Sequence, residues 1–361
     1  MTTLLVQSDR IIDNYKAFVR DVSGAFVIPV LSANAYGVGE LFAARLLYEA
    51  GARIIAVTSL DSAIRLASEI KGIDVLLLTP YSTEEEIEAI VKNDIIATVG
   101  SYDNAVLLNG IAEKNNRCVR VHLKFNINRA GFGFLEEEIV KAVQIAKYLS
   151  SIIVAGAYTE FTGNEIKSKK SAERHYNGFK SIIDSLAKDE IIPDHIYAVS
   201  DYIAIKYPIL RFNTVLEKKL IVGRVQKCER LGYKRVGRLL SKVIEVRTVP
   251  AKYYVGSDNR YKTRNLTKIA LVPVGFSDGL SALSENEGNI LSVFSVFKGF
   301  RISIFTKSLC EINSKKVRVI GTISPDTVIT DVSKIECSAG DSVSFDTDPI
   351  FISPAVRRSY V

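Results

Sequence analysis

Residues 26–40 read FVIPVLSANAYGVGE, and this stretch sets the interpretation of the whole chain. Residues 26–31 are apolar throughout, which is typical of a strand buried on both faces of a parallel sheet. Residues 32–39 are small, polar and glycine-bearing, which predicts a turn where that strand ends. Residues 43–50 then have a helical pattern. We therefore predict a strand-turn-helix unit with a functional site at the end of its strand.

The same alternation of strand and helix continues to about residue 222. Further apolar, β-branched runs predict strands at residues 54–60, 75–79, 95–99, 119–125, 152–158, 195–200 and 214–222. Helical patterns fill the intervals, including residues 82–91, where Ser82 and Glu85 have the spacing of a capping box. This pattern predicts an α/β fold, a (β/α)8 TIM-type barrel, with its site at the C-terminal ends of the strands.

The pattern changes beyond about residue 231, where helical periodicity is nearly absent. Short strands are expected at residues 241–249, 268–274, 290–296, 300–304, 316–323, 328–332 and 342–345. We therefore predict two domains. The barrel spans residues 8–230, and a β-rich C-terminal domain spans residues 231–361 together with residues 1–7.

Composition restricts the classes of function. The chain of 361 residues is 47% hydrophobic and 24% charged, as expected of an ordinary globular protein. It has no apolar run of membrane-spanning length and no recognisable leader, so we expect a cytoplasmic protein without a membrane partner. The four cysteines and three histidines have no metal-ligand spacing, so no metal is expected. The net charge of +7 is densest at residues 224–242, where no aromatic platform accompanies the basic residues, and this favours a solvated connector over a nucleic-acid patch.

Residues 33–37, ANAYG, resemble the cofactor segment of bacterial alanine racemases, which has a lysine before these residues and a histidine after them. Residues 124–132, KFNINRAGF, and residues 272–279, VPVGFSDG, resemble two further landmarks of that family. The resemblance covers essentially the whole chain. It implies removal of an amino-acid α-proton with pyridoxal phosphate as electron sink, by a Schiff-base lysine and a tyrosine of the partner subunit.

The resemblance places different residues at the catalytic positions of the family. Ser32 stands where the family has its Schiff-base lysine, and a serine cannot form an imine. Ser257 aligns with the catalytic tyrosine, with Tyr254 as the alternative if the loop has shifted. Glu160 replaces a histidine, and Asp326 is retained from the family's Met-Asp turn.

The cofactor-binding positions are partly retained. Tyr36, Ser200 and Tyr360 match the hydroxyl groups that hold the phosphate in the family, although packing tyrosines and a helix-capping serine would explain them equally well. The remaining candidates are two lysines in the turn after the eighth strand and an arginine after the fifth, namely Lys218, Lys219 and Arg129. The arginine is suited to a carboxylate or a cofactor oxygen, or to a plain ion pair at the barrel rim.

Three functions are compatible with this pattern. The favoured one is a pseudoenzyme that binds a small anionic or amino-acid ligand, or a partner racemase, without covalently bound pyridoxal phosphate. The second is an enzyme of changed chemistry that uses Glu160, Asp326, Lys218 and Arg129. The third is an alanine racemase in which another lysine, such as Lys218, forms the imine. In each case the resemblance implies a homodimer with a composite site at the interface.

Overall fold

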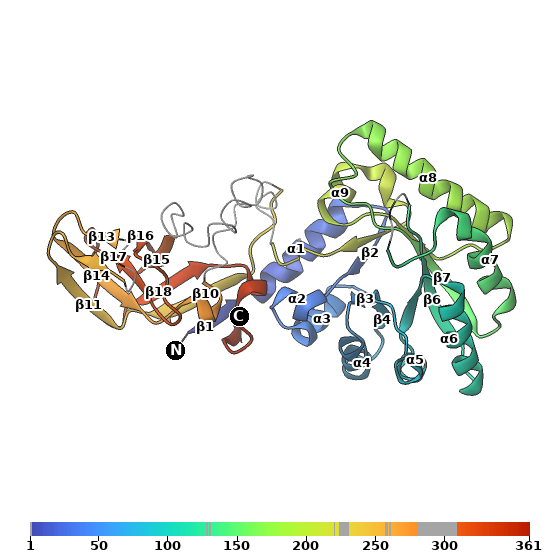
Figure 1. Cartoon of the computed structure of the whole chain (residues 1–361), viewed down its shortest axis with the longest axis horizontal. Coiled ribbons are helices and arrows are strands. Elements are labelled where there is room, and N and C mark those ends of the chain that lie inside the picture. Colours follow the sequence, from blue (N-terminus) through green and yellow to red (C-terminus); the bar gives the residue numbers. More distant parts are fainter. Residues whose placement is uncertain are drawn as a thin grey trace. The chain divides into compact units, whose positions relative to one another are not determined.

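The computed structural model describes residues 2–127, 129, 131–219, 221–223, 231–256, 259, 261–280 and 309–361. The chain divides into two compact units, Arg10–Lys234 and Met1–Asp9 with Arg235–Val361 (Figure 1). Ser257 and the strands expected at residues 290–296 and 300–304 lie outside the described residues.

The first of these units, Arg10–Lys234, contains a closed barrel of parallel strands. Its strands are β2 (Phe26–Pro29), β3 (Ile54–Val57), β4 (Asp74–Leu77), β5 (Ile96–Val99), β6 (Val119–Lys124), β7 (Ile152–Tyr158), β8 (His195–Tyr197) and β9 (Thr214–Glu217). Strands β3 to β8 pair in order, and β2 pairs with β9. Single bridges from Val30 to Ala56 and from Ser200 to Leu216 join the two sheets, so the ring closes. The predicted barrel is confirmed.

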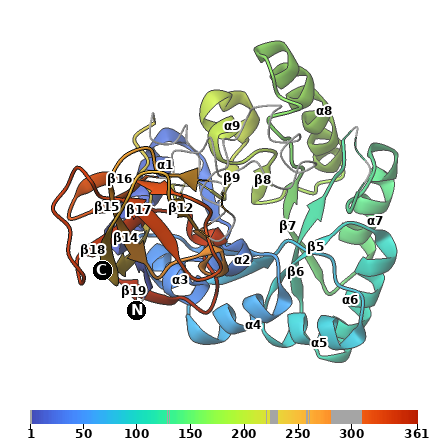
Figure 2. The ribbon, with the colours of Figure 1, turned by 60° about the vertical axis from the view of Figure 1, so that its left-hand side comes forward.

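Helices lie outside the strands, as Figure 2 shows for α4 to α7. They are α1 (Ser8–Asp21), α3 (Glu40–Glu49), α4 (Leu60–Glu69), α5 (Glu84–Lys92), α6 (Tyr102–Lys114), α7 (Ile139–Tyr148), α8 (Lys169–Lys188) and α9 (Asp201–Lys206), with 3-10 turns η1 (Glu136–Glu138) and η2 (Pro208–Arg211). The capping box predicted for α5 is wrong by one residue. Thr83 and Glu86 form it, and the amide of Ser82 also donates to Glu86 at 2.8 Å, so Ser82 lies just outside the helix.

The barrel interior combines an apolar core with a few buried polar groups. Its core consists of Ile28, Val30, Ile54, Ala56, Leu76, Ile96, Tyr158, Tyr197 and Leu216. The rings of Tyr158 and Tyr197 stack with centroids 4.6 Å apart. Thr98 Oγ1 donates to the carbonyl of Leu77 at 2.7 Å, and His122 Nδ1 lies 2.9 Å from Tyr197 Oη. These hydrogen bonds reduce the free-energy cost of burying the polar atoms that form them.

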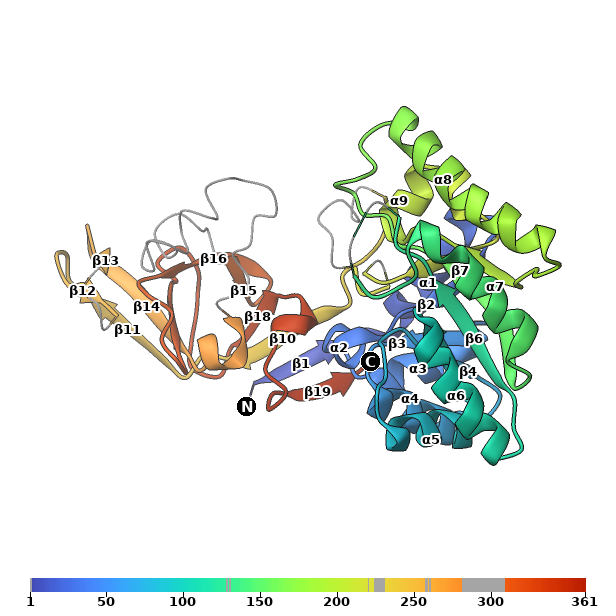
Figure 3. The same cartoon turned by 45° about the vertical axis from the view of Figure 1, so that its right-hand side comes forward.

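The second unit is built on one mixed sheet of nine described strands, in the order β11-β14-β17-β16-β15-β18-β10-β1-β19 (Figure 3). These are β1 (Thr3–Val6), β10 (Gly237–Lys242), β11 (Glu245–Val249), β14 (Thr267–Val272), β15 (Leu309–Ile312), β16 (Lys315–Ile320), β17 (Val328–Asp331), β18 (Ser342–Asp346) and β19 (Arg357–Tyr360). A hairpin, β12 (Tyr254–Val255) with β13 (Tyr261–Lys262), and two 3-10 turns, η3 (Phe276–Asp278) and η5 (Pro349–Phe351), complete it. The predicted β-rich C-terminal part is confirmed.

Candidate functional site

The segment after β2 is a single left-handed helical turn, labelled α2 (Ser32–Tyr36). Its residues Ala33, Asn34, Ala35 and Tyr36 have φ values of 50°, 57°, 53° and 54°. Left-handed helix costs an L-residue roughly 1–2 kcal/mol, so the turn persists only because its surroundings hold it. The turn ends at Gly37, and Asn34 Oδ1 accepts from the amide of Glu40 at 2.8 Å, which fixes the turn to α3. Ser32 is half-buried at the start of this strained turn.

Charged groups gather at the carboxyl ends of the barrel strands, where the barrel mouth is expected. Lys124 ends β6, Glu160 lies two residues past β7, and Lys218 directly follows β9. Lys218 Nζ forms an ion pair with Glu160. Burial by itself raises the pKa of Glu160, but Lys218, Lys124 and Arg129 together outweigh that effect and lower it. Glu160 is thus ion-paired with Lys218, and the charges of Lys124 and Arg129 also act on it.

Lys124 has the most unusual surroundings of these three cations. Its Nζ lies 5.4 Å from the ring centroid of Phe132 and 5.6 Å from that of Tyr158. Burial lowers the pKa of this lysine, Arg129 and Lys218 lower it further, and Glu160 opposes them. A lysine whose pKa is lowered is a better nucleophile at neutral pH than an ordinary surface lysine. Lys124 is the first residue of the landmark at residues 124–132, although the sequence assigned it no catalytic role.

Asp201 is a residue of the site that the sequence analysis did not identify. Its Oδ1 accepts from the backbone amides of Lys218 at 2.7 Å and Lys219 at 3.1 Å. Its own backbone lies in the left-handed region, with φ 50°. Burial raises the pKa of Asp201 and the two amides oppose that rise. The contact joins the start of α9 to the end of β9, so it exists only once the barrel has closed.

The other predicted residues of the barrel lie as follows. Ser200 precedes α9 and bridges to Leu216, but its side chain makes no capping hydrogen bond to the helix. Tyr36 is buried within the left-handed turn. Arg129 is exposed in the loop after β6.

Three predicted residues that the structure describes belong to the β-rich unit. Tyr254, the alternative to Ser257, lies in β12 and is exposed. Asp326 is exposed, and its Oδ1 lies 3.2 Å from the hydroxyl of Ser277 in η3. Tyr360 ends β19 and is 41% exposed.

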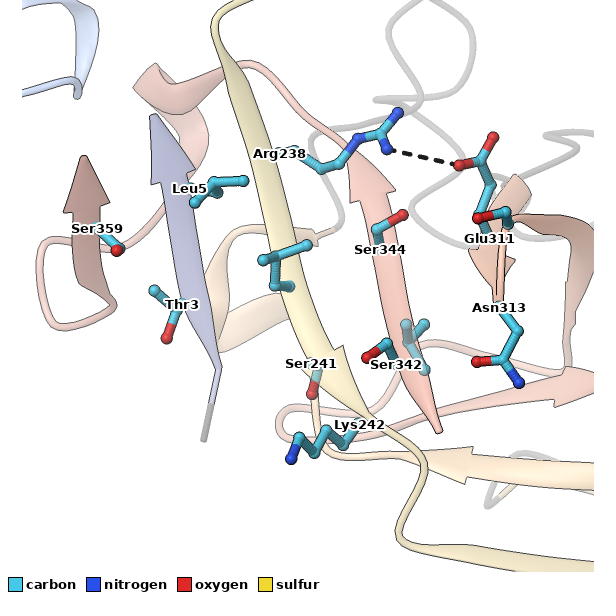
Figure 4. Close-up of a pocket in the computed structure, with 13 residues that line it drawn as sticks. Thr3, Leu5, Arg238, Ser241, Lys242, Glu311, Asn313, Ser342, Ser344 and Ser359 are labelled. Carbon is cyan, nitrogen blue, oxygen red and sulfur yellow. Dashed lines mark ion pairs between the residues drawn. The ribbon is translucent and has the colours of Figure 1, made fainter. Parts of the chain in front are cut away.

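The β-rich unit also contains a hollow of about 520 Å³ on its sheet (Figure 4). Short polar side chains such as Ser342 and Ser344 line it, beside an ion pair between Arg238 and Glu311 at 3.6 Å. These groups come from β10, β15 and β18, which are neighbours in the sheet. Of the charged side chains that line it, Arg238 and Glu311 pair with each other, and Lys242 carries the third charge. The barrel mouth, where three cations act on one carboxylate, is the stronger candidate for an anionic ligand.

The described part of the chain offers neither a metal site nor a membrane span. No cluster of three or more histidine, cysteine, aspartate or glutamate side chains there is arranged to hold a metal ion. Among the same residues, no helix is both long and apolar enough to cross a membrane.

A parallel eight-stranded barrel with charged groups at its strand ends, in one chain with a β-rich unit, defines an architecture that many enzymes use. Residues 6–210 match the family model of the alanine racemase N-terminal domain, and residues 236–349 match that of the alanine racemase C-terminal domain. The chain belongs to the alanine racemase family.

Individual relatives extend the match over most of the chain. An alanine racemase of Methanococcus maripaludis is 29% identical over 325 residues, 88% of this chain and 81% of that protein. One of Clostridium tetani is 26% identical over 347 residues, 94% of this chain and 84% of that protein.

Solved structures of low sequence identity share the fold. The alanine racemase of Clostridium difficile 630 is 23% identical with a TM-score of 0.83, covering 100% of this chain and 95% of that one. The alanine racemase of Bartonella henselae, solved with covalently bound pyridoxal phosphate, is 19% identical with a TM-score of 0.81, covering 100% and 99%.

Proposed function

We propose that this member of the alanine racemase family binds a small carboxylate-bearing, amino-acid-like ligand at its barrel mouth without holding pyridoxal phosphate covalently. The observation that carries the proposal is the cluster of Lys124, Arg129 and Lys218 around Glu160, beside a serine at position 32. Three cations attract a carboxylate, and the carboxylate of Glu160 suits an ammonium group. An amino acid carries both charges.

The described residues do not fit pyridoxal phosphate held as the family holds it. The hydroxyl of Ser32 cannot take the place of a lysine amine. Leu216, at the position where the resemblance implies an arginine, is buried in the core and offers the pyridine nitrogen no hydrogen bond. Lys218 and Lys219, in the turn after β9, are two of the cofactor-binding candidates, but their backbone amides already donate to Asp201. These three observations support a role that does not depend on the covalent cofactor.

The deciding experiment is a titration of the purified protein with pyridoxal phosphate, followed by absorbance, borohydride reduction and peptide mapping. We expect no reduced adduct at any barrel-mouth residue. A single modified lysine, present in stoichiometric amount, would overturn the proposal.

The ligand itself is tested by differential scanning fluorimetry with a panel of amino acids and dicarboxylates. Glu160→Gln removes the carboxylate that would meet an ammonium group, so amino acids that stabilise the wild type should lose most of their effect. Glu138→Gln, which removes a surface carboxylate paired with Lys141 at 2.8 Å, is the matched control and should respond like the wild type. Equal responses of both variants would place the ligand elsewhere.

The second candidate function is an amino-acid racemase, or another amine-dependent enzyme, that uses a substitute lysine. One observation favours it, namely the lowered pKa of Lys124 at the barrel mouth. The sequence analysis had named Lys218, but Lys218 is engaged with Glu160, so Lys124 is the better candidate. Exchange of the alanine α-proton in deuterated water, lost in Lys124→Met, would establish this function.

We also infer a homodimer, in which the β-rich unit of one subunit completes the barrel mouth of the other. The family resemblance supports this arrangement, and a partner racemase could take the place of the second copy. Sedimentation at micromolar concentration checks it. A clean monomer would contradict the homodimer and make the partner racemase the next interaction to test.

A further inference from the structure

The amides of Lys218 and Lys219 form an anion-binding nest at the end of β9. Two consecutive backbone N–H groups converge there on one oxygen atom, at 2.7 Å and 3.1 Å. Convergent successive amides form concave sites that bind phosphate and other anions. The positive charges of the two lysine side chains add to the attraction at this position. In this chain the oxygen that fills the nest belongs to Asp201.

We propose that Asp201 is a permanent occupant of this nest and closes it to phosphate, so that the barrel mouth selects against phosphorylated ligands. The carboxylate is tethered to the same barrel, so it competes with a free anion at a high effective concentration. It also satisfies both amides, which a ligand would otherwise satisfy. Asp201 is therefore a specificity-determining residue that acts by filling the nest.

The backbone at Asp201 supports a dedicated contact. Its φ of 50° lies in the left-handed region, which aspartate tolerates better than most residues and glycine tolerates best. The neighbouring Ser200, by contrast, is extended, with φ −132° and ψ 167°. The backbone thus passes from the extended to the left-handed region between Ser200 and Asp201, the residue whose side chain fills the nest. Burial raises the pKa of this carboxyl group, so its ionised form depends on the two amides and the lysine charges around it.

The test measures binding of inorganic phosphate by calorimetry to the full-length wild type, Asp201→Gly and Asp201→Asn. Glycine removes the carboxylate at a position whose φ suits it. We expect Asp201→Gly to bind phosphate about tenfold or more tightly than the wild type. Asp201→Asn keeps a side-chain oxygen that can accept from both amides. The nest of this variant should therefore remain closed to phosphate, as in the wild type.

Asp194→Ala is the matched control, because it removes an exposed carboxylate just before β8, whereas Asp201 follows that strand. It should bind phosphate no more tightly than the wild type. Equal phosphate affinity of Asp201→Gly and the wild type would overturn the proposal, and so would a gain in Asp194→Ala that matches the gain in Asp201→Gly.

A second measurement needs no variant. Selective labelling with ¹⁵N-lysine reports the amides of Lys218 and Lys219 in the wild type while inorganic phosphate is added. We expect their signals to stay in place, and a saturable shift of both would overturn the proposal even if Asp201→Gly failed to fold. Because the probe is phosphate alone, the result is independent of the amino-acid ligand and of covalent cofactor binding proposed above.

Discussion

At the scale of single residues, we expect two side chains to determine what the barrel mouth can hold. Ser32 places a hydroxyl at the start of the left-handed turn, and Asp201 places a carboxylate on the amides of Lys218 and Lys219. The first removes a covalent anchor, and the second fills a nest for an anion. On the function proposed above, both must change before pyridoxal phosphate is held as the resemblance implies, so we expect their effects to be cooperative and not additive.

A double substitution tests this cooperativity. We expect Ser32→Lys alone to give little borohydride-trapped adduct with pyridoxal phosphate, because the nest remains filled. Ser32→Lys combined with Asp201→Gly should give about tenfold more adduct at the same subsaturating concentration. Peptide mapping of position 32 is the measurement, and Ser32→Ala with Asp201→Gly is the control. Equal labelling of the single and double variants would contradict the expectation.

His122 makes the stability of the barrel depend on pH. It is fully buried, and burial, with smaller effects from His195 and Arg120, lowers its pKa to about 3. The native state therefore keeps His122 neutral, while the unfolded chain binds a proton below about pH 6.5. The free energy of unfolding should fall as pH decreases from 6.5 toward 3, by up to about 1.4 kcal/mol per pH unit from this residue.

The check is the pH dependence of urea unfolding in the wild type and in His122→Gln. The carboxylates of the barrel also titrate in this range, so the difference between the two slopes is the informative quantity. The wild type should show the steeper slope. Parallel slopes would mean that His122 is protonated in the folded state as readily as in the unfolded chain.

At the scale of elements, the left-handed turn of residues 33–36 is the least expected feature of the barrel. Ala33 is exposed and has φ 50°, so glycine would relieve the strain there without removing buried contacts. The relief of roughly 1–2 kcal/mol exceeds the entropic cost of glycine in the unfolded chain. We expect Ala33→Gly to stabilise the protein by about 0.5–1 kcal/mol in urea unfolding.

The matched control is Ala89→Gly in the right-handed helix α5, where glycine should destabilise by about 1 kcal/mol. If Ala33→Gly raises the free energy of unfolding and Ala89→Gly lowers it, the backbone strain at Ala33 is established. A loss of stability in both variants would show that the turn is not strained at that residue.

The sequence predicted the existence of these elements better than their ends. Buried apolar runs located all eight described barrel strands, because burial on both faces leaves a strong local pattern. The strand expected to reach residue 222 ends at Glu217, because Lys218 and Lys219 turn their amides toward Asp201. That contact joins residues far apart in sequence, so no local pattern reveals it. The handedness of the turn after Ser32 was equally hidden, because alanine gives no signal for positive φ.

At the scale of the whole molecule, the chain forms its β-rich unit from both of its ends. Strand β1 pairs antiparallel with β10 and parallel with β19, so it is an interior strand of the sheet. Leu4 and Val6 on it are fully buried. The amide of Gln7 donates to Val236 at 2.9 Å, and Val361 donates to Val6 at 3.0 Å. The N-terminal strand thus supplies pairing that the remaining strands cannot replace.

Fragments test this dependence. We expect residues 235–361 alone to remain unfolded or to aggregate, because removing β1 exposes the edges of β10 and β19. Residues 2–9 joined to residue 235 by a short loop should restore the fold, because β1 and β10 then form an antiparallel hairpin. Circular dichroism and size-exclusion chromatography distinguish the two outcomes. In the full-length chain, Leu4→Ala should cost about 2–5 kcal/mol, and this loss should fall on the β-rich unit because Leu4 packs there. Folding of residues 235–361 without β1 would show that the β-rich unit does not require the N-terminal strand.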